Sequence, residues 1–299
     1  MSSAGSIHAP GSPRASGPWR RALRRFCRRP LGVVAFAVLL LLFAVGLFAG
    51  DLAPYSAGSE FVQFINKPQP LFTAHHWLGT DVIGHDFLTQ MLFAVHETLG
   101  ASLLCAPGAA VLGAILGALA GYYGGVVDGI VTFVSAALWS VPAIAILLIV
   151  VIFSKFPVTP AQFGFYLLLY LWPGVARVVR AQFIALRDRE YVEAAHAAGA
   201  SGPRIILRHL LPNSSGPIIV AMSALVGQSI IIVATVDYLG WGTEQSEKPT
   251  LGSLIADATR GTGFAAAPWW LYFIPGVTLA VLLACVNLVG DALDEALSA

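Results

Sequence analysis

Six long stretches that contain no charged residue and no histidine most constrain what this chain can fold into. Each is close to the roughly 20 residues that an α-helix needs to cross the hydrocarbon core of a bilayer. They cover residues 31–50, 98–121, 129–153, 156–176, 213–236 and 268–290. The sequence therefore predicts an all-α polytopic membrane protein with six transmembrane helices.

The composition agrees with this fold class and excludes others. Hydrophobic residues make up 57% of the 299 residues and charged residues only 11%, against about 25% charged residues in an ordinary soluble domain. A soluble globular enzyme is therefore excluded. The chain has 17 lysines and arginines and 16 acidic residues, so there is no basic excess to bind nucleic acid. The three cysteines are too widely spaced for a zinc site or a disulfide framework.

Lysine and arginine sort to one side of the predicted helices. Seven arginines precede the first stretch and six lie in residues 177–212, whereas four cations fall on the other side. The positive-inside rule assigns the richer side to the cytoplasm. Both termini and the 177–212 segment are therefore predicted to be cytoplasmic, with the substantial segments 51–97 and 237–267 outside.

These assignments divide the chain into four parts. A cytoplasmic tail, in which residues 1–18 lack apolar periodicity, precedes the first transmembrane helix. An extracytoplasmic segment separates that helix from a core that carries the most polar loop. The predicted boundaries are 1–30 for the tail, 31–50 for the first helix, 51–97 for the outer segment, and 98–299 for the core with its cytoplasmic loop at 182–212.

The predicted helices contain little reactive chemistry. They hold no ionisable residue, which argues against a proton-coupled carrier, although Glu97, Asp128 and Asp237 lie next to predicted helix ends. None of the three lysines follows a glycine, so the chain has no phosphate-binding P-loop. Gly113, Gly117 and Gly121 recur on one helical face. This spacing predicts close packing against a neighbouring helix.

The cytoplasmic loop contains two short predicted helices. Asp188 is expected to cap the first, and Gly199 suits the left-handed position that ends it. Ser201 is expected to cap the second, whose first turn tolerates Pro203, and Pro212 ends it. A short alanine-rich helix of this kind fits closely into a groove on a partner, but the residues alone equally allow an ordinary solvated loop.

The same loop resembles a known motif. Glu193-Ala194-Ala195, then Gly199, then Leu211-Pro212 is similar to the EAA loop of ABC-importer permeases. His209 replaces the usual isoleucine, and the HxLPN ending that results is similar to that of the dipeptide/oligopeptide permease subfamily. The loop therefore identifies the chain as a member of the peptide/nickel family of ABC-importer permeases.

Three further segments resemble the C-type subunit of that family. Residues 76–86 resemble its HxLGTDxxGRD segment, with His85 in place of arginine. Residues 239–242 resemble its FLGLG turn, preceded by Asp237 where serine is usual. Residues 268–269 and 287–294 resemble its PW dipeptide and NLLGDxLRD ending. The loss of the arginine at position 85 puts any salt bridge of that segment in doubt.

The resemblance implies a fold, a function and partners. The fold would be that of a type I ABC importer permease, one N-terminal helix plus a five-helix core. The chain would be a non-enzymatic subunit in a bacterial cytoplasmic membrane, forming half of the pore of an importer for di- or oligopeptides. It would need no cofactor of its own, because ATP and magnesium would bind to separate ATPases. The implied partners are a homologous second permease in a heterodimer, two ATPase subunits and an extracytoplasmic solute-binding protein.

The resemblance also assigns the site residues. The EAA helix would insert into a cleft of the ATPase, so that closure of the ATPase dimer moves the attached spans. The residues expected in this coupling are Glu190, Tyr191, Glu193, Ala194, Ala195, Gly199, Ala200, Arg204, His209 and Pro212. Arg204 and its neighbour Arg208 have a second interpretation, contact with lipid headgroups.

Other interpretations stay open at this point. Polar residues of the fifth span are candidates to line the substrate path, or to bond across helices: Asn213, Ser223, Gln228, Ser229 and Thr235. His75, His76 and His85 suggest a nickel or zinc site, although no metal site is our expectation. A nickel, haem-like or other peptide-like ligand, a stand-alone secondary carrier and a membrane scaffold are the alternative functions.

Overall fold

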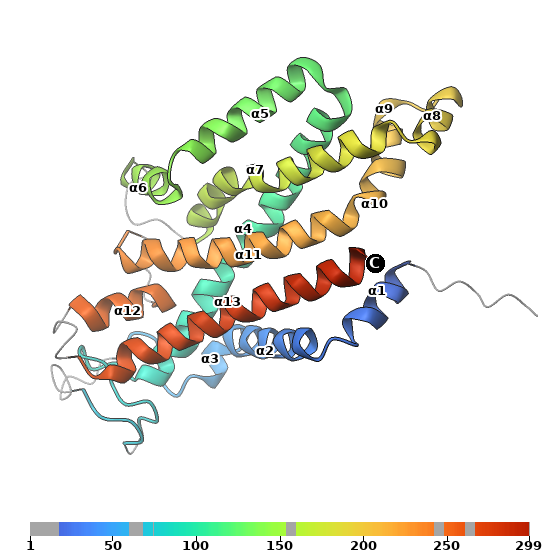
Figure 1. The fold of residues 1–299 in the computed structure, drawn as a ribbon. Coiled ribbons are helices and arrows are strands. Elements are labelled where there is room, and N and C mark those ends of the chain that lie inside the picture. The colour runs from blue at the N-terminus through green and yellow to red at the C-terminus, as the bar shows by residue number, and fades with distance from the viewer. Residues whose placement is uncertain are drawn as a thin grey trace, which may run out of the picture.

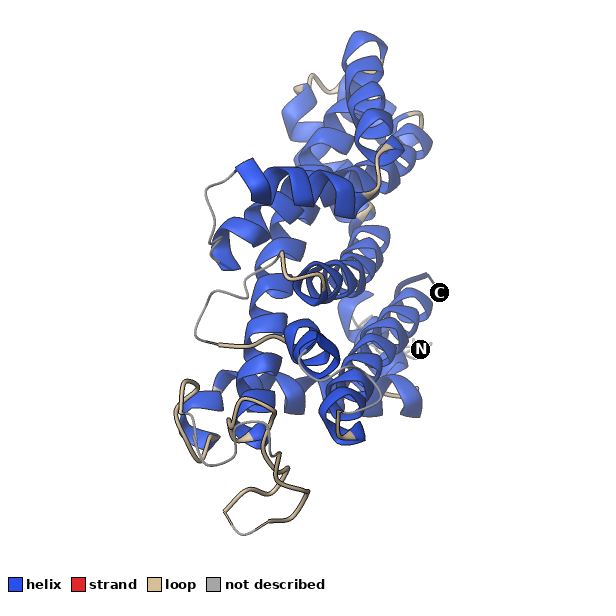
Figure 2. Ribbon diagram, turned by 90° about the vertical axis from the view of Figure 1, so that its left-hand side faces the viewer, coloured by secondary structure: helices blue, strands red, loops and turns tan. Residues whose placement is uncertain are grey.

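The computed structural model describes residues 18–59, 68–73, 75–153, 160–241, 248–260 and 267–298. Over these ranges the chain folds into helices joined by loops, without a strand (Figure 2). Five of the described helices are long and apolar enough to cross a membrane: α2 (Pro30–Leu47), α4 (Phe87–Tyr123), α7 (Pro160–Arg187), α11 (Ser215–Tyr238) and α13 (Trp269–Ser298). The predicted all-α polytopic fold is confirmed.

The third predicted helix is broken into two. Helix α5 (Gly125–Ser140) and helix α6 (Ala143–Phe153) are bent by 88° at the break between them. Val141 is extended there, with φ −103° and ψ 132°, because the ring of Pro142 disfavours helical geometry in the preceding residue. The expectation of one continuous helix over residues 129–153 is therefore wrong, and the pair forms a sixth span only as a bent one.

Two other long helices extend beyond their charge-free stretches. Helix α4 starts at Phe87, not at residue 98, because the Asp86 carboxylate accepts a hydrogen bond from the Thr89 amide at 2.8 Å and caps the helix. Helix α7 continues to Arg187, eleven residues past the predicted end at 176. Both helices therefore continue into polar sequence, so the charge-free stretches underestimate their length.

These longer helices contain ionisable residues. Glu97 lies in α4, Asp128 in the first turn of α5, and Asp237 near the end of α11, where it is fully buried. Arg177 and Arg180 lie in α7. The prediction that the helices hold no charged side chain is correct for the central stretches and wrong for these ends. Residues 154–159, at the junction of the third and fourth predicted stretches, and residues 1–17 of the predicted tail lie outside the described residues.

The glycine stripe of α4 packs against α7. A Cβ added at Gly113, Gly117 or Gly121 would lie within 3.0 Å of atoms of α7, namely of Trp172, Val175, Ala176, Phe183 or Arg180. Glycine therefore lets the two backbones approach one another more closely than any side chain would permit. The packing role predicted from the four-residue spacing is confirmed.

The remaining helices surround this pair. Helix α2 packs on α13 and α4, and most of its large apolar side chains stay exposed. Figure 1 shows α1 (Pro18–Phe26), the end of α13, α8 (Glu190–Ala197), α9 (Gly202–Ile205) and α10 (Leu211–Asn213) at one end of the bundle. At the opposite end lie α3 (Ala49–Leu52), α12 (Leu251–Arg260) and residues 68–86.

Two buried clusters hold these helices together. The first joins α4, α7, the α8–α10 loop and α11, around Phe163, Phe183 and Leu210. The second joins the start of α4 to α11, α12 and α13, around Phe87 and Leu251. The α8–α10 loop is thus part of the first core and not an appendage to it.

Replacing Gly117 by alanine tests the close contact. The new Cβ would collide with the Ala176 backbone, and overpacking of this kind costs about 1–3 kcal/mol. We expect Gly117→Ala to lower the midpoint of thermal unfolding of the detergent-solubilised protein. Gly100→Ala is the matched control in the same helix, because nothing lies within 4 Å of its added Cβ. Equal midpoints for the two variants would contradict this role of Gly117.

Candidate functional site

The first short helix of the cytoplasmic loop, α8, stands directly after α7. It begins one residue later than expected, so that Arg189 occupies the N-cap position without a side-chain hydrogen bond. Asp188 is therefore not the cap, and its carboxylate lies 3.5 Å from the Arg187 guanidinium. The fully buried side chain of Val192 fixes the helix on the core, and this burial sets the register in place of the expected cap.

Gly199 ends α8 as predicted. Its φ of +77° is left-handed, a region that favours glycine. The Gly199 amide donates to the His196 carbonyl at 2.9 Å, and the Ala200 amide donates to the Ala195 carbonyl at 3.0 Å. These two bonds form a Schellman motif. Gly199 therefore sets the direction in which the chain leaves α8.

The second short helix changes its winding before Pro212. Ser201 is the N-cap residue of α9 as expected, but it makes no side-chain cap bond, and Pro203 lies in the first turn. Residues 206–210 form one π-helical turn, in which the Leu211 amide donates to the Ile206 carbonyl five residues earlier. Such turns relieve local strain in a helix. The expected single helix is therefore α9, the π turn and α10 in succession.

The loop residues assigned to coupling form a mostly exposed surface. Helix α8 exposes the side chains on either side of buried Val192, and Tyr191 is 40% exposed. Ala195, Ala200 and His209 are partly buried. The exposed members are Glu190, Tyr191, Glu193, Ala194, Gly199, Arg204 and Pro212. The structure thus places five of the ten predicted residues on α8, whose exposed side chains include Glu190, Glu193 and Ala194, and the other five in the segment that follows it.

Two contacts lie where this loop meets the long helices: one joins α8 to the end of α4, and the other joins the ends of α7 and α4. The Tyr122 hydroxyl at the end of α4 lies 3.3 Å from His196 Nε2 of α8, and the two rings are stacked with an interplanar angle of 10°. The Arg187 guanidinium donates to the Gly121 carbonyl at 3.4 Å. The sequence analysis missed Tyr122 and His196, because nothing in the spacing of two residues 74 positions apart indicates their contact.

An ion pair ties the start of α5 to α7. Arg180 donates to both carboxylate oxygens of Asp128, with Nη2 at 2.7 Å from Oδ2, and the pair is partly exposed. Bidentate pairing fixes orientation as well as distance. The end of α4, the start of α5, the last turns of α7 and helix α8 are therefore joined by directional polar contacts.

The five candidates for the substrate path separate into two groups. Four bond to carbonyls of their own helical segment and not across helices: Asn213 to His209 at 2.6 Å, Ser223 to Val220 at 2.7 Å, Ser229 to Val226 at 2.8 Å and Thr235 to Ile231 at 2.7 Å. Gln228 is exposed and lines a cavity of about 360 Å³. Ser223 lines a second cavity whose other lining residues are apolar, so of the five Gln228 is the one that lines a cavity together with other polar side chains.

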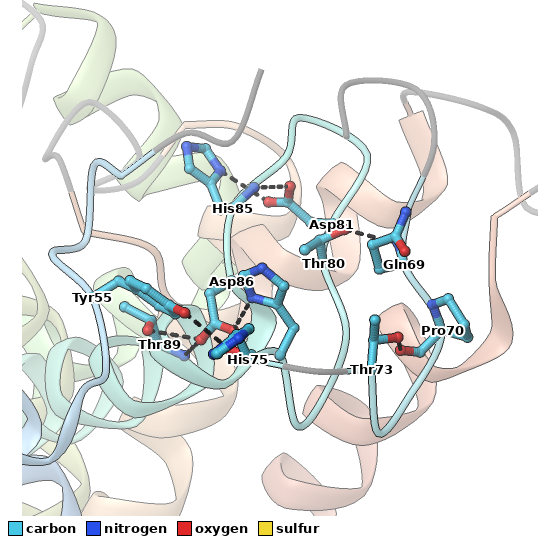
Figure 3. Close-up of polar contacts among 11 residues, drawn as sticks. Tyr55, Gln69, Pro70, Thr73, His75, Thr80, Asp81, His85, Asp86 and Thr89 are labelled. Atoms are coloured by element: carbon cyan, nitrogen blue, oxygen red, sulfur yellow. Dashed lines mark hydrogen bonds and ion pairs between the residues drawn. The ribbon is translucent and has the colours of Figure 1, made fainter. Parts of the chain in front are cut away.

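Residues 76–86 at the opposite end fold around two aspartates (Figure 3). The buried Asp86 carboxylate accepts from His76 Nδ1 and from both the amide and the hydroxyl of Thr89, each at 2.8 Å. The Asp81 carboxylate accepts from three successive amides, Ile83 to His85, and lies 2.9 Å from His85 Nδ1. His85 therefore keeps a polar contact at the position where the family has arginine.

The three histidines suggested as metal ligands do not converge. His76 and His85 each turn to a different aspartate, and His75 accepts a hydrogen bond from the Tyr55 hydroxyl through its carbonyl at 3.1 Å (Figure 3). Among the described residues no three His, Cys, Asp or Glu side chains are grouped to hold a metal ion. The polar contacts of this segment fold it back on itself.

Comparisons with known proteins agree with this architecture. Residues 113–299 match the model of the binding-protein-dependent transport system inner membrane component, and residues 17–68 match the N-terminal transmembrane domain of oligopeptide transport permease C. The solved structure of the MetNI methionine ABC transporter in an inward-facing conformation contains a similar chain, with a TM-score of 0.57 and 18% identity over 71% of this chain and 97% of that one. That likeness concerns the fold.

Several characterised relatives span nearly the whole chain. The oligopeptide transport system permease OppC of Mycobacterium tuberculosis is 35% identical, covering 93% of this chain and 94% of its own. The glutathione transport system permease GsiD of Pectobacterium atrosepticum is 32% identical over 94% and 90%, and the dipeptide permease DppC of Alkalihalophilus pseudofirmus is 30% identical over 95% and 90%. The chain belongs to this family of binding-protein-dependent transport permeases and is a multi-pass membrane protein.

Reversing the charge of Arg180 tests the brace between α5 and α7. We expect Arg180→Glu to destabilise the solubilised protein by about 1 kcal/mol or more, because it removes charge-assisted hydrogen bonds that are partly screened by solvent. Adding Asp128→Arg in the same chain should recover part of the loss in thermal unfolding. Arg208→Glu, at an exposed residue of the loop, is the control. A double variant less stable than Arg180→Glu alone would contradict the pairing.

Replacing Asp86 by asparagine tests the fold of residues 76–86. The amide cannot accept all three hydrogen bonds of the buried carboxylate, and an unsatisfied buried group costs about 1–3 kcal/mol. Limited proteolysis should therefore cleave this segment faster in Asp86→Asn. The exposed Asp51 provides the matched control variant, Asp51→Asn. Cleavage at the same rate in both variants would show that Asp86 does not hold the segment.

Proposed function

We propose that this chain is a pore-forming permease subunit of an ATP-driven importer of di- or oligopeptides in a bacterial cytoplasmic membrane. The observation that carries the proposal is the loop after α7, in which the exposed helix α8 follows α7 directly and is held to the end of α4 by the contact between Tyr122 and His196. The names of the relatives above, which concern oligopeptides, dipeptides and the tripeptide glutathione, support the substrate class.

The orientation follows from the distribution of cations. Helix α1, the end of α13 and the α8–α10 loop share one end of the bundle (Figure 1). Of the 14 arginines, 13 precede residue 31 or lie in residues 177–212. The positive-inside rule favours a cytoplasmic position for that end. Residues 68–86 and α12 then face a solute-binding protein on the outer side.

The energy source lies on other chains. This sequence has no P-loop lysine, so ATP and magnesium bind to two separate ATPase subunits, and this chain needs no cofactor of its own. A homologous second permease completes the pore as a heterodimer. In this proposal the chain transmits the movement of the ATPases to the membrane helices and forms part of the path that the peptide follows.

Each part of the loop has a distinct task in this transmission. The Glu193 carboxylate pairs with a basic group of the ATPase, and Ala194 and Ala195 allow close approach of its surface. Gly199 sets the angle between the two arms of the loop through its left-handed backbone. Movement of α8 passes to α4 through Tyr122 and to α7 through the chain itself, because α8 begins three residues after α7 ends.

Reversing the charge at Glu193 tests the coupling. We expect Glu193→Arg to reduce ATP-driven peptide uptake about tenfold or more, as the loss of a charged contact predicts, while ATP hydrolysis and membrane insertion continue. The measurement is uptake against ATP hydrolysis in liposomes that contain both permeases, the ATPases and the binding protein. Asp51→Arg makes the same reversal at the opposite end. Wild-type uptake by Glu193→Arg would refute the coupling role.

Gly199 gives a second test based on backbone geometry. Valine is strained at φ +77°, whereas asparagine tolerates the left-handed region better than other side chains. No other atom lies within 4 Å of an added Cβ, so the two variants differ in backbone strain and not in collisions. We expect Gly199→Val to uncouple uptake from hydrolysis more strongly than Gly199→Asn. The opposite order would argue against the angle of the loop as the relevant property.

A further inference from the structure

The cavity that Gln228 lines lies beside the broken span. It has a volume of about 360 Å³, and its wall comes from the α5–α6 pair, α7 and α11 (Figure 1). Trp139, Tyr170 and Gln228 supply its polar groups, and Ala143, Leu171 and Ile231 are among its apolar ones. By comparison, the described cavities between α4 and the loop and around α2 are lined almost wholly by apolar side chains.

A cation contacts Trp139, one of the residues that line this cavity. The Arg177 guanidinium carbon lies 4.3 Å from the centre of the Trp139 ring. Arg177 and Tyr170 are seven residues apart in α7 and so share one helical face. Arg177 is exposed and forms no ion pair with any described residue, whereas Arg180, one turn away, is bound to Asp128. The charge of Arg177 is therefore available to an anion.

The geometry of the bend holds these groups in place. The Tyr170 hydroxyl donates to the Val141 carbonyl at 3.2 Å, at the break between α5 and α6. The Trp139 ring passes over Gly174, where an added Cβ would lie 3.5 Å from Trp139 Cζ2. Because Gly174 stands between Tyr170 and Arg177 on the same face of α7, all three residues of that face contact or approach the bend.

We propose that this cavity is a transient binding site in the transport path for the carboxylate of a peptide substrate, with Arg177 as its charged contact and Gln228 as a second donor. The inference rests on the proposed function. An arginine beside apolar walls is costly without a counter-ion, and a passing carboxylate supplies one. Contact with Trp139 keeps the guanidinium oriented between substrates.

A lipid phosphate is the other anion with the same chemistry. Arg177 lies ten residues before the end of α7, which is about 15 Å along the helix at 1.5 Å per residue. The stacking on Trp139, a residue that lines the cavity, favours a ligand that enters the cavity over a lipid headgroup. An experiment therefore has to separate a peptide carboxylate from lipid contact.

The test compares two variants and two peptides in the complete importer reconstituted in liposomes. Arg177→Gln removes the charge, and Arg177→Lys keeps it. Trialanine and trialanine amide differ only in the terminal carboxylate, and their uptake is measured by mass spectrometry. We expect Arg177→Gln to slow trialanine uptake about tenfold or more, the loss typical of a charge-assisted hydrogen bond. Arg177→Lys should stay much closer to wild type, and any uptake of the amide should change little in either variant.

Other outcomes overturn the inference. Equal slowing of trialanine by both variants, or equal slowing of acid and amide by Arg177→Gln, would indicate packing or lipid contact, and no slowing would exclude any role. Absence of uptake by the wild type would count against the proposed function itself. Thiol labelling then decides the inference alone: in a Cys27→Ser, Gln228→Cys background, an anionic sulfonate reagent should modify residue 228 more slowly when Arg177→Gln is added, relative to a neutral thiol reagent, than when Arg177 is present. Equal rates would overturn it.

Discussion

The close contact between α4 and α7 is the interaction on which the rest of the structure depends. In a bilayer, helices gain little from burying apolar side chains, so association relies on backbone approach and tight packing. The glycine stripe of α4 provides that approach along α7. The ends of the two helices then lie together, joined by the hydrogen bond from Arg187 to the Gly121 carbonyl. Helix α8 follows α7 directly and contacts α4 through Tyr122, so its position depends on both helices.

Polar contacts fix the two ends of the bundle that this helix packing holds together. Aromatic stacking, a bidentate ion pair and a carbonyl contact all occur near the loop, whereas residues 76–86 use buried aspartates to fold back on themselves. Both ends of the molecule therefore present surfaces whose shape is fixed before a partner arrives. Preorganisation of this kind reduces the ordering that association requires. It suits a chain whose role is to pass movement between partners.

The sequence predicted the features that depend on local chemistry. The uncharged stretches located the membrane helices, the four-residue spacing of Gly113, Gly117 and Gly121 located their closest contact, and Gly199 marked the end of α8. The start of α8 was misjudged at Asp188 because burial of Val192, a tertiary effect, sets its register. The Tyr122–His196 stacking and the orientation of Arg177 over Trp139 join distant segments, which no local pattern encodes.

The bend at Val141 has a consequence for the surrounding lipid. If α6 runs nearly across α5, the crossing of the bilayer at this point is left to α5 alone, whose 16 residues extend about 24 Å. The hydrocarbon core is about 30 Å thick. The bent span is thus too short to match it, and the mismatch is resolved by local thinning of the bilayer or by a neighbouring chain that covers the bend. Membrane thickness thereby becomes one of the variables to which this part of the protein responds.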